Sequence, residues 1–324
     1  MTAKRILVWT GGSDFGLADA VSAIAGVEVV RAADRDAALA RMAEVDAFVT
    51  SVVPWNADFA AALEASSTLQ WVQVLNAGFD NMQRLGVPRR IVVTNLGAVN
   101  STVVAEHALL LLLALIRRLP TLVASQARSE WTFRQVAPTL TTLRDKTIAV
   151  LGFGHIGRRF AELAGAFGAH VTGVASRART EPNGIRVVPL SSLGSVLAVS
   201  DAVIVTLPLT AATDQLVDAD VFRALKPGAH LVNISRGRLV VTKALLSALD
   251  DGTLAGAALD VTDPEPLPSD HPLWRHPKVL VTPHVAGMGG GEIVRQEMED
   301  LIVDNVRRFV AGEPLRNIAA IHDV

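Results

Sequence analysis

Three side chains with complementary acid–base properties, Arg236, Glu265 and His284, each come a few residues after an apolar, strand-forming run. If these runs are parallel strands, the side chains meet at the carboxyl edge of one sheet, where ligands of open α/β sheets bind. A guanidinium can bind a carboxylate and polarise a keto oxygen, and a protonated imidazole can supply the proton that a new alkoxide needs. A carboxylate bonded to the imidazole favours its charged form and fixes its tautomer. The pattern therefore indicates hydride transfer to a 2-keto acid, with Arg236 orienting and polarising the substrate and His284 with Glu265 as a proton relay.

Each of the three residues also has a structural explanation when it is considered alone. Arg236 precedes a glycine and could cap a strand, Glu265 stands between two prolines and could be a solvated turn residue, and a lone histidine is often a satisfied structural residue. Their occurrence together, downstream of a nucleotide-binding motif, favours the catalytic interpretation.

That motif is the segment Thr147–Gly157, in which a run of β-formers leads into Gly152, Gly154 and Gly157 at the spacing G-x-G-x-x-G. The following residues, Arg158–Phe167, have the composition and apolar spacing of a helix. The first glycine allows the turn, the second lets the backbone approach a pyrophosphate, and the third lets the helix lie close to the strand. Glycine-rich turns also occur without a ligand, but the strand and helix on either side favour a dinucleotide site.

The end of the next strand indicates which nicotinamide cofactor binds. NAD-specific sites carry an acidic residue there, which takes the ribose hydroxyls. This chain instead has Ser176, Arg177 and Arg179. Guanidinium forks match a 2′-phosphate, so the sequence predicts NADPH (NADP) in preference to NADH. The alternative is that these arginines are solvated loop charges.

Composition excludes several other classes of function. Of the 324 residues, 50% are hydrophobic and 19% charged, with a formal net charge of -2, so charge gives no argument for a nucleic-acid or membrane partner. The chain has no cysteine, which excludes disulfides and a thiolate nucleophile, and we expect no metal site. The apolar run near the N-terminus is too short for a signal peptide, so we expect a cytoplasmic protein.

The elements that must position these residues form two α/β series. In residues 4–100, short apolar runs alternate with amphipathic stretches, which indicates a parallel sheet with crossover helices. A long apolar helix is expected over Ser101–Arg118, and an irregular segment over Thr121–Arg144. From Thr147 onward a second series follows, with six expected strands. The final amphipathic helix, Glu292–Val310, is expected to return to the first domain.

The sequence motifs resemble those of the D-isomer-specific 2-hydroxyacid dehydrogenase family over essentially the whole chain. Besides the glycine motif they are Val104-Ala105-Glu106-His107, Thr206-Leu207-Pro208-Leu209-Thr210, Val232-Asn233-Ile234-Ser235-Arg236-Gly237, Ala258-Leu259-Asp260-Val261 with Pro264-Glu265-Pro266, and Thr282-Pro283-His284-Val285. The resemblance implies an α/β protein of two doubly wound parallel-sheet domains with a cleft between them. Residues 1–100 and 290–324 would form a flavodoxin-like substrate domain, and residues 101–289 a Rossmann-type dinucleotide-binding domain.

The resemblance also implies roles for individual residues. Arg236, Glu265 and His284 match the catalytic residues of the family. Asn76, Ala77 and Gly78 would present backbone N–H groups to the substrate carboxylate, although a plain turn is the alternative. Trp55 is a candidate pocket wall, with a surface or interface tryptophan as the alternative. The residues expected to bind the cofactor are Val104, Gly152, Gly154, His155, Ile156, Gly157, Ser176, Arg177, Arg179, Thr206, Leu207, Pro208, Thr213, Ile234, Ser235, Arg236, Asp260, His284 and Ala286.

Two departures from the family pattern narrow the prediction. The missing acidic residue after the second strand resembles the NADPH-using glyoxylate and hydroxypyruvate reductases. Val241-Thr242-Lys243 stands where many members have Val-Asp-Glu, outside the proposed proton relay. The family implies a homodimer, and the apolar helix Val103–Ile116 is consistent with one.

Two alternatives to a keto-acid reductase stay open. Glu265 speaks against the formate-oxidising branch, which lacks this glutamate, but a phosphite oxidiser is not excluded. A nicotinamide-sensing binding protein of the corepressor type is the alternative from another class, and the complete set of catalytic residues argues against it.

Overall fold

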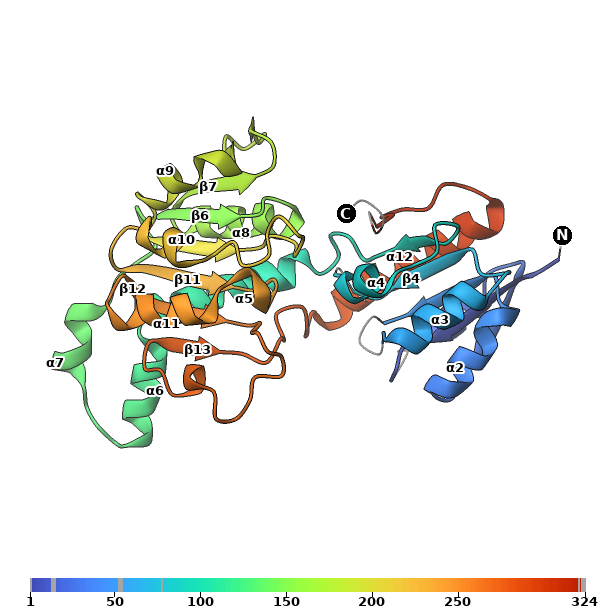
Figure 1. The fold of residues 1–324 in the computed structure, drawn as a ribbon, viewed down its shortest axis with the longest axis horizontal. Helices are drawn as coiled ribbons and strands as arrows, with labels where there is room; N and C mark the ends of the chain where they lie inside the picture. The colour runs from blue at the N-terminus through green and yellow to red at the C-terminus, as the bar shows by residue number, and fades with distance from the viewer. Residues whose placement is uncertain (1, 13–15, 52–54, 77, 320, 322–324) are drawn as a thin grey trace. The chain divides into compact units, whose positions relative to one another are not determined.

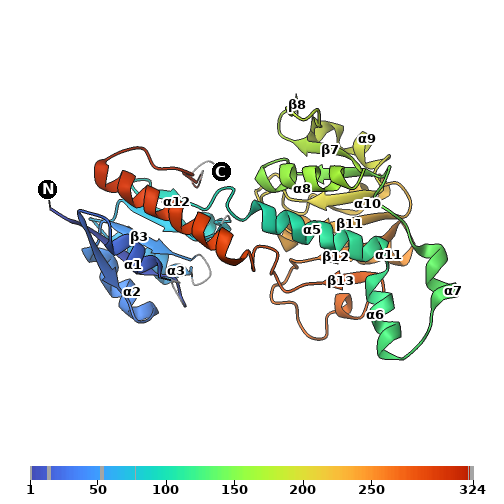
Figure 2. The same ribbon diagram turned by 180° about the vertical axis from the view of Figure 1, so that it is seen from behind.

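The chain forms two compact units in a computed structural model, which describes residues 2–12, 16–51, 55–76, 78–319 and 321. Unit 1 comprises Met1–Asn100 and Gly290–Val324, and unit 2 comprises Ser101–Gly289. Each contains a parallel sheet covered by helices on both faces (Figures 1 and 2). The expected fold class, an α/β protein of two doubly wound domains, is confirmed.

Unit 1 has the strand order of a flavodoxin-like sheet, β2-β1-β3-β4-β5, among its described residues. Its central strands β3 and β4 are buried along their whole length, because helices cover both faces. Its strands are β1 (Lys4–Trp9), β2 (Val27–Arg31), β3 (Ala47–Thr50), β4 (Trp71–Val74) and β5 (Val92–Thr94). Its helices are α1 (Leu17–Ser22), α2 (Arg35–Arg41), α3 (Ala57–Ala65), α4 (Asp80–Leu85) and α12 (Gly291–Ala311).

Helix α12 packs on unit 1, although more than half of the chain lies between it and β5 (Figure 2). Its Ile302 and Val306 are fully buried in a cluster with residues of β1, β3 and α1. Asn305 on the same face is also fully buried, and its amide donates to Gln73 Oε1 of β4 over 3.0 Å. Because a buried amide without a partner is costly, this bond specifies where the helix docks.

Unit 2 contains the sheet β13-β12-β11-β10-β6-β7-β9-β8, in which β8 is antiparallel to β9 and the other strands are parallel. The order β9-β7-β6-β10-β11-β12 is that of a dinucleotide-binding fold, with its topological switch point between β6 and β10. The strands are β6 (Thr147–Leu151), β7 (His170–Ala175), β8 (Arg179–Thr180), β9 (Arg186–Pro189), β10 (Ala202–Val205), β11 (Ala229–Asn233), β12 (Leu254–Leu259) and β13 (Val279–Val281).

The helices of unit 2 cover both faces of this sheet. They are α5 (Ser101–Ile116), α6 (Leu119–Ala127), α7 (Phe133–Val136), α8 (His155–Ala166), α9 (Leu193–Leu197), α10 (Ala219–Arg223) and α11 (Thr242–Asp250). Helices α5 and α8 pack on one face, whereas α9, α10 and α11 pack on the other (Figures 1 and 2). Within the part of the chain that the structure describes, no single helix has the length and apolarity of a membrane span, and only α5 and α6 together, bent by 66°, meet that test.

Several local expectations were wrong. The segment after α5 is helical, in α6 and α7, where an irregular stretch was expected. Arg118 has a positive φ of 53°, a conformation that cannot continue helix α5. Helix α6 then begins with a proline in its first turn. Proline is tolerated in the first turn of a helix because the N–H that it lacks has no partner there. Strands β8 and β9 were not expected either. β8 has only two residues, and β9 has four and ends in a proline, so neither shows the alternation of apolar and polar residues that predicts a strand.

Candidate active site

The glycine loop between β6 and α8 is held by contacts that exclude larger side chains. Gly152 has a φ of 92°, and a Cβ on it would lie 2.7 Å from the backbone nitrogen of Leu207. A Cβ on Gly157 would lie 2.4 Å from the carbonyl oxygen of Gly152. Both positions therefore need glycine for the loop to form at all.

Gly154 differs from the other two glycines of the motif. It is exposed, and a Cβ on it would meet no atom within 4 Å. Packing within the protein therefore does not require glycine here. The residue precedes the first turn of α8, whose free N–H groups and dipole favour an anion, so an open backbone at this point fits the pyrophosphate of a dinucleotide.

The loop after β10 closes around this turn through hydroxyl groups. Thr206 Oγ1 donates to the carbonyl oxygen of Gly152 over 2.5 Å, and Ser235 Oγ donates to that of Leu207. Thr213 is buried, and its hydroxyl donates to the carbonyl of Pro208 over 2.6 Å while accepting from the backbone N–H of Thr210. The Thr213 side chain therefore shapes the loop from within, and any contribution to cofactor binding is indirect.

Arg236 stands on a turn that directly follows β11. The fully buried Asn233 donates its amide to the carbonyl of Arg236 over 2.9 Å and accepts from the backbone N–H of Ser235. A Cβ on Gly237 would lie 1.9 Å from the carbonyl oxygen of Thr262, so only glycine lets the segment after β12 pack against this turn. Gly237 thereby brings the loop that carries Glu265 close to the loop that carries Arg236.

Glu265 and His284 form a direct pair. Glu265 Oε1 lies 2.5 Å from His284 Nδ1, and both side chains are partly exposed. The expected contact between the two residues is therefore present. Because the carboxylate accepts at Nδ1, this nitrogen carries a proton, and Nε2 is the ring nitrogen left to face a substrate.

The backbone around His284 is anchored by Asp260, the residue that follows β12. Its side chain is fully buried and accepts from the backbone N–H of Val285 over 3.0 Å and from that of Ala286 over 2.9 Å. The N–H of His284 donates to the Asp260 carbonyl over 2.8 Å, and His284 itself has a φ of 53°. The position of Asp260 therefore determines the path of residues 282–286, the segment that carries His284 and is called the catalytic loop here.

The arginines after β7 have different environments. Ser176 and Arg177 are exposed, whereas Arg179 donates to Glu181 Oε1 over 2.6 Å and to the carbonyl of Phe153 over 2.7 Å. Hydrogen bonds from Arg158 and then Arg179 hold the pKa of the Glu181 carboxyl below its usual value. The sequence reasoning missed Glu181, because the hairpin β8–β9 that carries it toward the loop was not predicted.

The residues that were expected to contact the substrate belong to unit 1. Asn76 Oδ1 accepts from Ser51 Oγ over 3.1 Å at the end of β4, and Gly78 is half-buried. Ala77 lies outside the described residues. Trp55 is only 5% exposed and stacks on Phe59 within the core of the unit, with ring centroids 5.5 Å apart. The Trp55 side chain therefore contributes to the core of the unit, and its expected role as a pocket wall stays a prediction.

The remaining cofactor candidates divide by exposure. His155 and Pro208 are exposed, and Ile156 is half-buried at the start of α8, whereas Val104, Ile234 and Ala286 are buried in the core beside the glycine loop. The described residues contain no group of three or more histidine, aspartate or glutamate side chains that could hold a metal ion.

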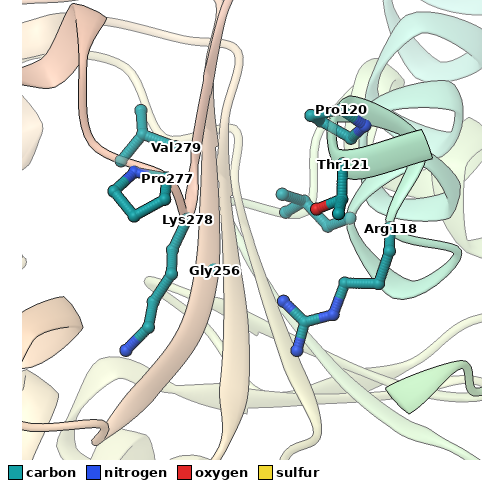
Figure 3. A pocket seen from close by; sticks show the side chains of 8 residues that line it. Arg118, Pro120, Thr121, Gly256, Pro277, Lys278 and Val279 are labelled. Atoms are coloured by element: carbon teal, nitrogen blue, oxygen red, sulfur yellow. The ribbon is translucent and has the colours of Figure 1, made fainter. Parts of the chain in front are cut away.

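A separate pocket of unit 2 lies between the end of α5 and the start of β13 (Figure 3). Arg118, Pro120 and Thr121 line one side, while Gly256 and Lys278 line another (Figure 3). None of the three catalytic candidates lines this pocket. It is therefore distinct from the site at the carboxyl edge of the sheet.

Comparison with known proteins identifies relatives of this chain. Residues 109–286 match the model of the D-isomer specific 2-hydroxyacid dehydrogenase, NAD binding domain. The chain is 34% identical to a glyoxylate reductase of Thermococcus kodakarensis over 86% of this chain and 84% of the relative. It is 36% identical to a D-3-phosphoglycerate dehydrogenase of Mycobacterium tuberculosis over 86% of this chain, but it spans only 52% of that relative.

Solved structures give the same result. A D-isomer specific 2-hydroxyacid dehydrogenase from Xanthobacter autotrophicus Py2, in complex with NADPH and MES, superimposes with a TM-score of 0.82 at 29% identity. The superposition covers 99% of each chain.

Proposed function

Since the chain belongs to the D-isomer specific 2-hydroxyacid dehydrogenase family, we propose that it uses NADPH to reduce a small 2-keto acid to the D-2-hydroxy acid. Glyoxylate and hydroxypyruvate are the proposed substrates. The observation that carries the proposal is the Glu265–His284 pair, with its 2.5 Å contact, on the same sheet edge as the glycine loop. A carboxylate held against an imidazole at the edge of the sheet where ligands bind is the arrangement that a proton donor needs.

In the proposed reaction the nicotinamide, when bound, supplies a hydride to the keto carbon. The Arg236 guanidinium binds the substrate carboxylate and stabilises the charge that develops on the keto oxygen. His284 donates a proton from Nε2 to that oxygen, because its Nδ1 is held by Glu265. Asn76 and Gly78 of unit 1 are proposed to bind the substrate carboxylate through backbone N–H groups.

The preference for NADPH is proposed to depend on Arg177 more than on Arg179. Arg179 is bonded to Glu181 and to the carbonyl of Phe153, so its guanidinium is already paired. Arg177 and Ser176 are exposed at the end of β7, where a 2′-phosphate would lie. Arg177→Ala should raise the KM for NADPH by about tenfold or more and leave that for NADH nearly unchanged. Equal efficiency of the wild-type enzyme with both cofactors would contradict the preference.

The proposal is tested by initial rates of NADPH and NADH oxidation with glyoxylate, hydroxypyruvate, pyruvate, phenylpyruvate and a branched 2-keto acid. Arg236→Ala should lower kcat/KM by about a thousandfold, and His284→Ala by about a hundredfold or more. Arg223→Ala, at an exposed arginine of α10, is the matched control and should have no effect.

Two other results would redirect the proposal. Turnover of phosphite but of no keto acid would make the chain an oxidiser of that anion. Tight NADPH binding without turnover of any compound would instead favour a nicotinamide-sensing binding protein. The proposed homodimer and cytoplasmic location are independent of this choice.

A further inference from the structure

His107 of α5 belongs to the sequence motif Val104-Ala105-Glu106-His107 and has no role in the proposed mechanism. The side chain is 17% exposed, and its Nε2 lies 3.2 Å from Thr282 Oγ1 and 3.4 Å from Asp260 Oδ1. Thr282 is two residues before His284, and Asp260 anchors the two residues after it. His107 therefore contacts both groups that hold the catalytic loop.

The hydrogen-bond pattern assigns the direction of these contacts. The Thr282 hydroxyl donates its single hydrogen to Asp260 Oδ1 over 2.6 Å. Its oxygen can then only accept from His107, so Nε2 of His107 carries a proton and donates. A proton at this nitrogen also faces the carboxylate oxygen of Asp260, which is electrostatically favourable.

The Asp260 carboxylate has no exposed surface, so protein donors must take the place of water. Three of them, the Thr282 hydroxyl and the N–H groups of Val285 and Ala286, come from the catalytic loop itself. His107 is the contact from outside the loop and comes from a helix packed in the core of unit 2. It links the loop to a rigid element.

We propose that His107 is a positioning residue for His284, acting through Thr282 and Asp260. By donating from Nε2 it fixes the Thr282 hydroxyl and the Asp260 carboxylate, and these in turn fix the backbone on both sides of His284. His107 itself touches neither substrate nor cofactor in this role. The inference rests on the proposed function of His284 as proton donor.

The test compares His107→Gln, whose amide can place a donor where Nε2 stands, with His107→Leu, which cannot donate. Hydrogen exchange of the Val285 and Ala286 amides is measured in the whole protein. We expect exchange to rise by about tenfold or more in His107→Leu and by about threefold at most in His107→Gln. The amides of β10 should be unchanged in both, which shows that the core is intact.

Kinetics supply the second measurement. His107→Leu should lower kcat by about tenfold with little change in the KM for NADPH, and His107→Gln should restore most of it. Thr282→Val removes the intermediate hydroxyl, so the losses in the double variant His107→Leu/Thr282→Val should be clearly smaller than the two single losses combined. Additive losses would show that His107 acts by another route and would overturn the inference.

The failure of this inference is distinguishable from failure of the proposed function. If the wild-type protein turns over keto acids but His107→Leu leaves exchange and kcat unchanged, the inference is wrong and the function stands. If His284→Ala has full activity, the proposed function is wrong. Increased exchange confined to Val285 and Ala286 in His107→Leu would still support the link from His107 to the loop.

Discussion

At the scale of single residues, the site depends on a histidine in an uncommon backbone conformation. His284 has a φ of 53°, which costs a non-glycine residue of the order of 1 kcal/mol or more. The N–H of His284 and the Asp260 carboxylate make the bonds that hold this conformation. The result is an imidazole aimed at Glu265 on one side and free to face a substrate on the other.

Glu265→Gln tests the pair directly. Glutamine keeps the shape and can still accept at Nδ1, but it does not favour the charged imidazole as a carboxylate does. We expect kcat for keto-acid reduction to fall by about tenfold, with little change in the KM for NADPH. Initial rates at saturating cofactor measure this loss. An unchanged kcat would mean that Glu265 has no part in proton transfer.

At the scale of elements, the glycines of the turn from β6 into α8 are of two kinds. Two are required for folding, and at the third position packing would accept a larger residue. Gly152 and Gly157 are surrounded by backbone atoms and Val150, whereas nothing lies near Gly154. The strand, the turn and the helix thus form a unit whose folding depends on two glycines. Packing does not require the remaining glycine, Gly154, which fits the close approach of a ligand.

Gly154→Ala should therefore leave the free energy of unfolding nearly unchanged and weaken NADPH binding by about tenfold or more, because a methyl group blocks the approach of the pyrophosphate. Gly157→Ala, the matched variant, should destabilise the protein by about 1–3 kcal/mol through the contact with the Gly152 carbonyl. Thermal unfolding without cofactor and fluorescence titration with NADPH measure the two effects. Unimpaired NADPH binding by Gly154→Ala would argue against a pyrophosphate at this turn.

At the scale of the whole molecule, the expected dimer has a second candidate surface besides helix α5. Helix α5 is mostly buried within unit 2, although its Leu110 is 54% exposed. Further exposed apolar side chains lie on the segment of α6 and α7, which extends from the body of unit 2 (Figures 1 and 2). They include Val123 at 54%, Trp131 at 94% and Phe133 at 66% exposure.

We expect the wild-type protein to have twice the chain mass of 34.3 kDa by light scattering after size exclusion. Val123→Glu combined with Trp131→Ser should give the monomer mass, because both changes remove apolar area from the same surface. Val199→Glu, at a 58% exposed valine after α9, is the control and should leave the mass unchanged. A monomeric wild type would refute the dimer.

Stability of the molecule should depend on pH through His230. Burial, and then the charge of Arg118, lowers the pKa of His230 from 6.5 to about 4. The folded state therefore leaves this group neutral where the unfolded state binds a proton, and stability falls as pH drops below 6.5 toward 4. Between about pH 7.5 and pH 5 the loss is about 2 kcal/mol. Urea unfolding of the wild type and of His230→Leu measures it, and an equal decrease in both would rule out His230 as the cause.

The sequence by itself determined the two-domain α/β class and the identity of the candidate triad. Strand and helix periodicity, and glycines that tolerate a tight turn, are properties of short segments and can be read without knowing their neighbours. The positions of Arg236, Glu265 and His284 after strands were enough to place them at one edge, because parallel strands end together. The contact between Glu265 and His284 followed from this.

Only the tertiary structure decided which groups are paired and which are free. Arg177 and Arg179 look equivalent in the sequence, but a short hairpin brings Glu181 to one of them. Trp55 was expected only as a candidate pocket wall, and the structure packs it into the core of unit 1. His107 contacts Thr282, which is 175 positions away in the sequence. Such contacts join distant segments and depend on packing, so no local pattern encodes them.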